Sequence, residues 1–146
     1  MRAVVQRVTR ASVRVEDDLL AGIGPGLLVL VAVADTDTEA EAAWLARKVA
    51  RLRLFPGPDH AIDRSLLDTG GAALVVSQFT LYGDTRRGNR PSFSTSARPE
   101  AAARLVDRFG DLLAAEGVPV QRGRFGAIMD VDLVNSGPVT LIVDTP

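Results

Sequence analysis

The stretch Leu27-Leu28-Val29-Leu30-Val31-Ala32-Val33-Ala34 decides the fold, because it is the longest apolar run in the chain. Aliphatic residues without an interspersed polar position are typical of a strand that is buried on both faces. A run of 8 residues is far too short to span a membrane. The strand-like opening, Met1–Val8, lacks the apolar core of a signal peptide. We therefore expect a cytoplasmic protein that makes no use of a membrane.

A helix is expected soon after this strand. Thr36 with Glu39, or Thr38 with Glu41, fits a capping box, in which a hydroxyl and a carboxylate satisfy the free amides of a helix start. The apolar residues that follow recur at helical spacing and form one core-facing stripe: Leu45, Val49 and Leu52.

A second helix is predicted in the C-terminal half. Pro99 is of the type favoured at a first helical position, and Gly117 suits a helix C-terminus. The residues between them supply a second apolar stripe: Leu105, Phe109, Leu112 and Leu113.

Most other apolar segments have the pattern of strands. They are Met1–Val8, Ala11–Val15, Leu19–Ala21, Leu52–Phe55, Ala72–Gln78, Met129–Leu133 and Val139–Val143. The last two flank Asn135-Ser136-Gly137-Pro138, which predicts a C-terminal hairpin. The order is not a strict alternation of strand and helix, which argues against a doubly wound fold. We predict one mixed α/β domain, residues 1–146: a barrel-like antiparallel or mixed sheet with two main helices packed outside.

The composition excludes several kinds of site. The chain has no cysteine, so disulfides, thiol nucleophiles and cysteine-ligated metals are excluded. Its one histidine, His60, cannot form a multi-histidine metal site, and its polar surroundings are typical of an exposed loop. The net charge of -1 gives no general attraction for nucleic acid, so any such contact needs a local patch. The densest basic segment is Arg86-Arg87-Gly88-Asn89-Arg90, which suits either a solvated loop or a phosphate contact.

Polar residues directly follow the apolar strand that ends near Val76, in Ser77-Gln78-Phe79-Thr80-Leu81-Tyr82-Gly83-Asp84. Polar side chains and free amides at the end of a strand are a common way to build a site on a rigid element. Simple capping of the strand explains the same residues.

Several motifs, taken together, resemble those of the D-aminoacyl-tRNA deacylase family in its bacterial and eukaryotic form. They are the opening Met1–Val8, Ser77-Gln78-Phe79-Thr80-Leu81, Arg90-Pro91-Ser92-Phe93, Phe125-Gly126-Ala127 with Met129, and Asn135 with Gly137-Pro138 and Thr140. The similarity covers nearly the whole chain. Gly83 stands where the family usually has alanine, and Ala61–Arg64 is less typical of it.

The resemblance implies an enzyme that hydrolyses the ester between a D-amino acid, or glycine on non-cognate tRNA, and the terminal adenosine of tRNA. It implies a homodimer without metal or organic cofactor. A cis Gly137-Pro138 peptide is expected to reach the partner's pocket and reject L-amino acids by collision with rigid backbone. Arg7 is expected to hold that loop.

The remaining site residues follow from the same resemblance. Ser77, Gln78, Phe79 and Thr80 would line the ester site, where amides and the Ser77 hydroxyl stabilise an oxyanion. Phe125 and Met129 would flank the adenosine, and the other expected substrate-binding residues are Gly126, Ala127 and Asn135.

Because conventional acid–base groups are scarce, we expect attack by water with help from the ribose 2′-hydroxyl, although Thr80 or Ser77 is an alternative nucleophile. The main alternative function is a non-catalytic module that binds the tRNA 3′ end through Arg86, Arg87 and Arg90. An editing enzyme whose main substrate is a mischarged small L-amino acid or glycine, and a general esterase, are further alternatives.

Overall fold

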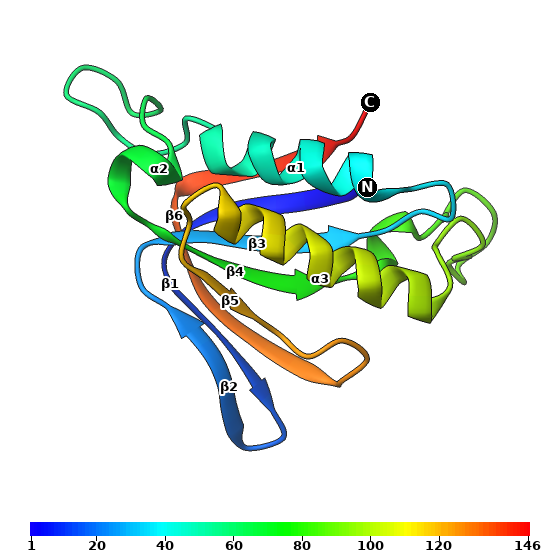
Figure 1. Ribbon diagram of the computed structural model, residues 1–146. Helices are drawn as coiled ribbons and strands as arrows, with labels where there is room; N and C mark the ends of the chain where they lie inside the picture. Colours follow the sequence, from blue (N-terminus) through cyan, green and yellow to red (C-terminus); the bar gives the residue numbers. More distant parts are fainter.

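Six strands form one mixed sheet, and two long helices cover one of its faces (Figure 1). The structure is a computed structural model that describes residues 1–146. Its elements are β1 (Arg2–Val15), β2 (Asp18–Ile23), β3 (Gly26–Ala32), α1 (Glu39–Arg51), α2 (Leu66–Thr69), β4 (Ala72–Ser77), a 3₁₀ turn η1 (Phe79–Tyr82), α3 (Pro99–Ala115), β5 (Val120–Arg122) and β6 (Met129–Asp144).

Strand β3 is buried on both faces, which confirms the interpretation of the apolar run. Leu27 and Val29 belong to a core that the sheet shares with α1 and α3. Leu28 belongs to a second core on the other face, where it lies with Leu74 of β4. Because successive side chains of a strand point to opposite faces, a strand between two cores needs an apolar residue at every position.

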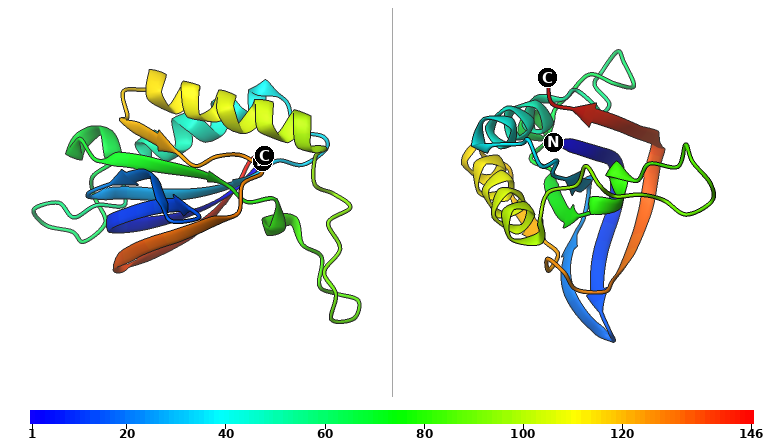
Figure 2. Two further views of the ribbon diagram at one scale, coloured as in Figure 1. Left: turned by 90° about the horizontal axis from the view of Figure 1, so that it is seen from below. Right: turned by 90° about the vertical axis from the view of Figure 1, so that its right-hand side faces the viewer.

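Strands β3, β4 and β5 run parallel, and each connection between them crosses through a helix. Both connections step in the same direction across the sheet. Right-handed crossovers that step the same way place their helices on the same face. Figure 2 shows α1 and α3 packed side by side there. The chain therefore contains parallel crossover units, but only one helical layer, so the fold is not doubly wound.

Strand β1 connects the parts of the sheet. Its first half pairs antiparallel with β3 and its second half with β2, while β6 follows its other edge. At the far end β2 comes into contact with β4 and β5, which curls the sheet around the second core (Figure 2). The expected barrel-like mixed sheet with two outer helices is confirmed, as a nearly closed barrel.

The predicted C-terminal hairpin is wrong, because β6 is one strand from Met129 to Asp144. Gln6 pairs with Thr140 and Val8 with Asn135, so the residues from Ser136 to Val139 form a bulge opposite Arg7. The partner of both halves is β1, which is long enough to pair with them in succession. For the same reason, the two strands expected over 1–8 and 11–15 are one strand.

The Gly137–Pro138 peptide is trans, since the structure contains no cis peptide bond, so the expected cis bond is wrong. The extra residues of the bulge are accommodated instead by Gly137, whose φ is 116°. This is a conformation that residues with a side chain rarely adopt. The Asn135 amide closes the bulge by donating to the carbonyl oxygens of Arg7 (3.0 Å) and Val139 (3.1 Å).

Both helix starts agree with the sequence. Thr38 and Glu41 form the capping box of α1, and Pro99 is the first residue of α3. Gly117 follows α3 with a φ of 104°. The strand expected over Leu52–Phe55 is only an isolated bridge between Phe55 and Arg64. No helix has the length and apolar character needed to cross a membrane.

A test of the β3–β4 pairing is available at Gly26. A Cβ added there would lie 1.9 Å from the Ala72 carbonyl oxygen, whereas one at Gly24 would meet nothing within 4 Å. We expect Gly26→Ala to lower the free energy of unfolding by about 3 kcal/mol or more, because backbone must move to admit the methyl group. Gly24→Ala is the matched control and should unfold at the wild-type denaturant concentration. Equal stability of the two variants would contradict the close approach of β3 and β4.

Candidate functional site

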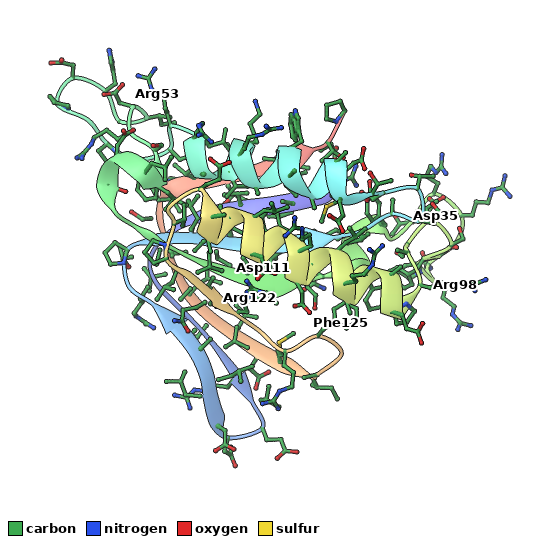
Figure 3. The ribbon with its side chains drawn as sticks, viewed as in Figure 1. Asp35, Arg53, Arg98, Asp111, Arg122 and Phe125 are labelled. Carbon is green, nitrogen blue, oxygen red and sulfur yellow. The ribbon has the colours of Figure 1, made fainter.

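A cavity of about 700 Å³ opens at the carboxyl end of β4. Three segments wall it: the end of β4 with the start of η1, the segment from Phe93 to the first turn of α3, and the turn that joins β5 to β6. Figure 3 places Arg98 and Phe125, from two of these segments, at the same end of the molecule. A strand end, a helix start and a turn thus converge on one hollow.

The first wall carries the polar motif after β4. The Gln78 amide N–H donates to the Val31 carbonyl oxygen at 2.8 Å, which extends the β3–β4 ladder by one bond. The chain then turns into η1, and no protein acceptor takes the backbone N–H of Phe79 or Thr80. The Gln78 side-chain amide donates to the Thr80 hydroxyl. Two free amides therefore follow a rigid strand end: that of Phe79, a residue that lines the cavity, and that of Thr80, the next residue of η1.

The second wall is attached to the end of β3. The Ala97 N–H donates to the Val33 carbonyl oxygen at 2.9 Å, and Ala34 pairs with Ser96. This connection brings the start of α3 beside η1. Across the cavity mouth the rings of Phe93 and Phe79 meet edge to face, with centroids 5.1 Å apart. Because Phe79 is 56% exposed and Phe93 37%, the two rings offer an apolar surface to a ligand.

The third wall is the turn after β5. The Gly123 N–H donates to the Val75 carbonyl oxygen at 2.9 Å, which holds the turn beside β4. Met129 begins β6 directly after this turn, and its sulfur accepts from the Arg124 N–H at 3.3 Å. Phe125 is 39% exposed at the cavity. A ring and a thioether on one wall suit a flat aromatic ligand.

The cavity gathers seven of the residues that the sequence singled out: Ser77, Gln78, Phe79, Phe125, Gly126, Ala127 and Met129. Thr80 is exposed on η1 but does not line the cavity. Sequence reasoning missed Phe93, Ser96 and Arg98 as lining residues. The signal that could have found them is the short polar run between Phe93 and Pro99, directly before a helix start.

The other predicted residues form a separate cluster away from the cavity lining, on the β1–β6 ladder. Arg7 is only 8% exposed, and it donates to the carbonyl oxygens of Ser136 (3.0 Å), Leu54 (2.5 Å) and Ala61 (3.3 Å). Gly137 and Pro138 are exposed beside it. The guanidinium therefore supports the bulge that presents Gly137 and Pro138 at the surface.

Two ionisable groups near the cavity have shifted pKa values. Hydrogen bonds from Arg86 lower the pKa of Asp84 to about 2. Burial, helped by the Asp37 carboxylate, raises the pKa of Tyr82 to about 12. His60 is exposed in its loop, as predicted. No three His, Asp or Glu side chains gather in a metal-binding arrangement.

Residues 4–144 match the family model described as D-Tyr-tRNA(Tyr) deacylase. The chain belongs to the D-aminoacyl-tRNA deacylase family. A D-aminoacyl-tRNA deacylase of Roseiflexus sp. is 59% identical over 99% of this chain and 94% of its own length. That of Bacillus velezensis is 52% identical over 99% of both chains. This chain is therefore a hydrolase, and by homology its activity is D-aminoacyl-tRNA deacylation.

Solved structures agree with the fold. One described as c-Myc DNA Unwinding Element Binding Protein superposes with a TM-score of 0.93 at 37% identity, over 100% of this chain and 99% of the other. Another, described as a probable eukaryotic D-amino acid tRNA deacylase, has a TM-score of 0.84 at 22% identity, over 99% and 98% of the two chains. The second supports the architecture alone.

The burial of Tyr82 can be measured directly, because it is the only tyrosine in the chain. Its folded-state pKa lies above the unfolded value of about 10. The stability that the neutral Tyr82 side chain contributes to the fold is therefore fully present below pH ~10 and is lost as the pH rises through about 12. Phenolate absorbance after a rapid pH jump should show a midpoint near 12 for the native protein and near 10 in denaturant. Tyr82→Phe should show no transition, and a native midpoint near 10 would contradict the burial.

Proposed function

We propose that the cavity at the end of β4 hydrolyses the ester between a D-amino acid, or glycine, and the 3′-terminal adenosine of tRNA. The observation that carries the proposal is the coincidence, in one cavity, of exposed aromatic rings with free amides at a strand end. The rings suit a nucleobase, and the amides suit a carbonyl oxygen that becomes negative. Family membership supplies the reaction class.

The terminal adenosine is assigned to the wall formed by Phe125 and Met129. Both side chains line the cavity, and the turn that carries Phe125 and leads into Met129 of β6 is fixed to β4 through Gly123. Gly126, with a φ of 77°, lets the backbone of this turn bend tightly, and Ala127 adds little bulk. A base stacked there would leave its ribose directed toward Ser77 and η1.

The ester carbonyl is assigned to the amides of Phe79 and Thr80. Water attacks the carbonyl carbon, and the oxyanion that forms accepts hydrogen bonds from these N–H groups and from the Ser77 hydroxyl. The bond from the carbonyl carbon to the ribose oxygen then breaks, and that oxygen leaves with a proton as a hydroxyl. The 2′-hydroxyl of the same ribose assists the water, because an aminoacyl ester needs positioning more than a strong base. The Gln78 side-chain amide holds the Thr80 hydroxyl by a hydrogen bond. We therefore assign Thr80 a positioning role and not that of the nucleophile.

Selection against L-amino acids is assigned to the backbone of Gly137 and Pro138, supplied by a second copy of the chain. These residues are exposed and do not line the cavity of their own chain. The same strand exposes Val134 (40%), Leu141 (38%) and Ile142 (69%), an apolar edge that a second copy would cover. Rigid backbone near the substrate α-carbon would collide with an L side chain, whatever its chemistry, and would admit a D side chain or glycine.

The test is deacylation of D-tyrosyl-tRNA beside L-tyrosyl-tRNA, with a chelator present. We expect loss of the D ester at least ~100-fold faster than loss of the L ester, because the collision is built against one enantiomer. On tRNA that ends in 2′-deoxyadenosine the rate should fall roughly 100-fold or more. Thr80→Ala should keep the rate within about fivefold, since loss of a true nucleophile costs far more.

Four outcomes of that assay would contradict the proposal. Binding of tRNA without loss of either ester would indicate a non-catalytic binding module. Equal loss of both esters would remove the stereochemical filter. A chelator-sensitive rate, or a Thr80→Ala variant without activity, would overturn the water mechanism.

A further inference from the structure

The arginines around the cavity differ in their ion pairing from many arginines elsewhere on the surface. Arg2, Arg10, Arg51, Arg53 and Arg122 each pair with a carboxylate. Arg87, Arg90, Arg98 and Arg124 are exposed and have no carboxylate within 4 Å. All four belong to segments that form or directly precede the cavity walls. Unpaired guanidinium groups gathered at one opening are free to bind an anion.

Arg87 and Arg90 lie on the loop between Asp84 and Ser92, which projects from the body of the molecule (Figure 2). Asp84 and Ser92 close the base of this loop with two backbone hydrogen bonds, of 2.7 and 3.0 Å. Asp84 is the only acidic residue of this loop. The Arg86 guanidinium neutralises it by donating two hydrogen bonds to its carboxylate. The loop therefore carries two uncompensated positive charges, and the residue after its base, Phe93, lines the cavity.

Of the other two arginines, one lines the cavity and the other is the chain neighbour of a lining residue. Arg98 precedes the first turn of α3 and is one of the lining residues. Arg124 comes directly before Phe125 on the opposite wall. Exposed cations thus flank an aromatic cavity on a chain whose net charge is -1. Because the molecule as a whole does not attract anions, a local patch of this kind needs its own explanation.

We propose that Arg87, Arg90, Arg98 and Arg124 bind the phosphates of the unpaired nucleotides that precede the terminal adenosine. The inference rests on the proposed function, which seats that adenosine in the cavity. A strand that leaves the cavity carries its next phosphates past the cavity walls, and these four arginines lie on those walls or on the loop that runs into Phe93. Guanidinium forks match phosphate oxygens, and contacts of this kind position a nucleic acid without reading its sequence.

A second basic group provides the matched control. Arg47 and Lys48 are exposed on α1, and the Lys48 ammonium lies 5.1 Å from the centre of the Trp44 ring. Arg53 also belongs to this group, and it pairs with Asp63. Figure 3 shows Arg53 at the opposite end of the molecule from Arg98. Arg47→Gln with Lys48→Gln removes two charges there, as Arg87→Gln with Arg90→Gln does on the loop.

The experiment compares two substrates, D-tyrosyl-tRNA and D-tyrosyl-adenosine, which has the ester and the base but no phosphate. For Arg87→Gln with Arg90→Gln, we expect KM for D-tyrosyl-tRNA to rise roughly fivefold with kcat unchanged. The dependence of log KM on log salt concentration should become shallower by about 1 to 2. With D-tyrosyl-adenosine, kcat/KM should stay at the wild-type value. The control variant, Arg47→Gln with Lys48→Gln, should match the wild type on both substrates.

The outcomes separate this inference from the proposed function. An equal loss on both substrates would show that the arginines act on the cavity and would overturn the phosphate assignment. So would an unchanged KM for tRNA in the double variant, or an equal rise in KM for the control variant Arg47→Gln with Lys48→Gln. If the wild type cleaves neither substrate, the proposed function itself fails. In that case tRNA binding with an unchanged salt dependence in the double variant would overturn the phosphate contacts as well.

Discussion

The parallel pairing of β3 with β4, between two apolar cores, is the constraint on which the rest of the structure depends. A parallel pair cannot be joined by a tight turn, so α1 must cross over the sheet and cover one face. The other face of the pair fills the curled barrel. The same pairing places the end of β4 at Ser77, where the chain leaves the sheet with its amides free. The cavity is therefore a consequence of how the core is built.

Arg7 imposes a second constraint, on the opposite edge of β1. A buried guanidinium without partners would cost several kcal/mol, but this one donates to three carbonyl oxygens. Those oxygens belong to the β6 bulge and to the loop after α1, so one side chain joins segments far apart in the sequence. A Cβ on Gly137 would lie 2.0 Å from the Arg7 Nη2 atom. The bulge is thus held against the Arg7 side chain, which three hydrogen bonds fix in place. Such a support suits the proposed rejection of L-amino acids by collision with the backbone.

Sequence patterns succeeded where the signal is local. Two-sided burial of β3, the capping box at Thr38, and the start of α3 at Pro99 each depend on a few neighbouring residues. They failed at the C-terminus, where Gly137-Pro138 has the composition of a hairpin turn. Whether such residues form a turn or a bulge depends on β1, which lies more than a hundred residues earlier in the chain. The cavity was only half predicted for the same reason, because the approach of Phe93 and Arg98 depends on pairing with the end of β3.

The proposed site is divided between two copies of the chain, because the cavity and the Gly137-Pro138 bulge lie apart in one copy. The most direct test mixes two variants. Ala127→Trp fills the cavity and keeps the bulge, whereas Pro138→Ala keeps the cavity and loosens the bulge. Excess Ala127→Trp protein is added to Pro138→Ala protein, and hydrolysis of D- and L-tyrosyl-tRNA is followed. The account predicts that L-ester hydrolysis by Pro138→Ala is suppressed while D-ester hydrolysis persists. L-ester hydrolysis that is unaffected by the added protein would contradict the shared site.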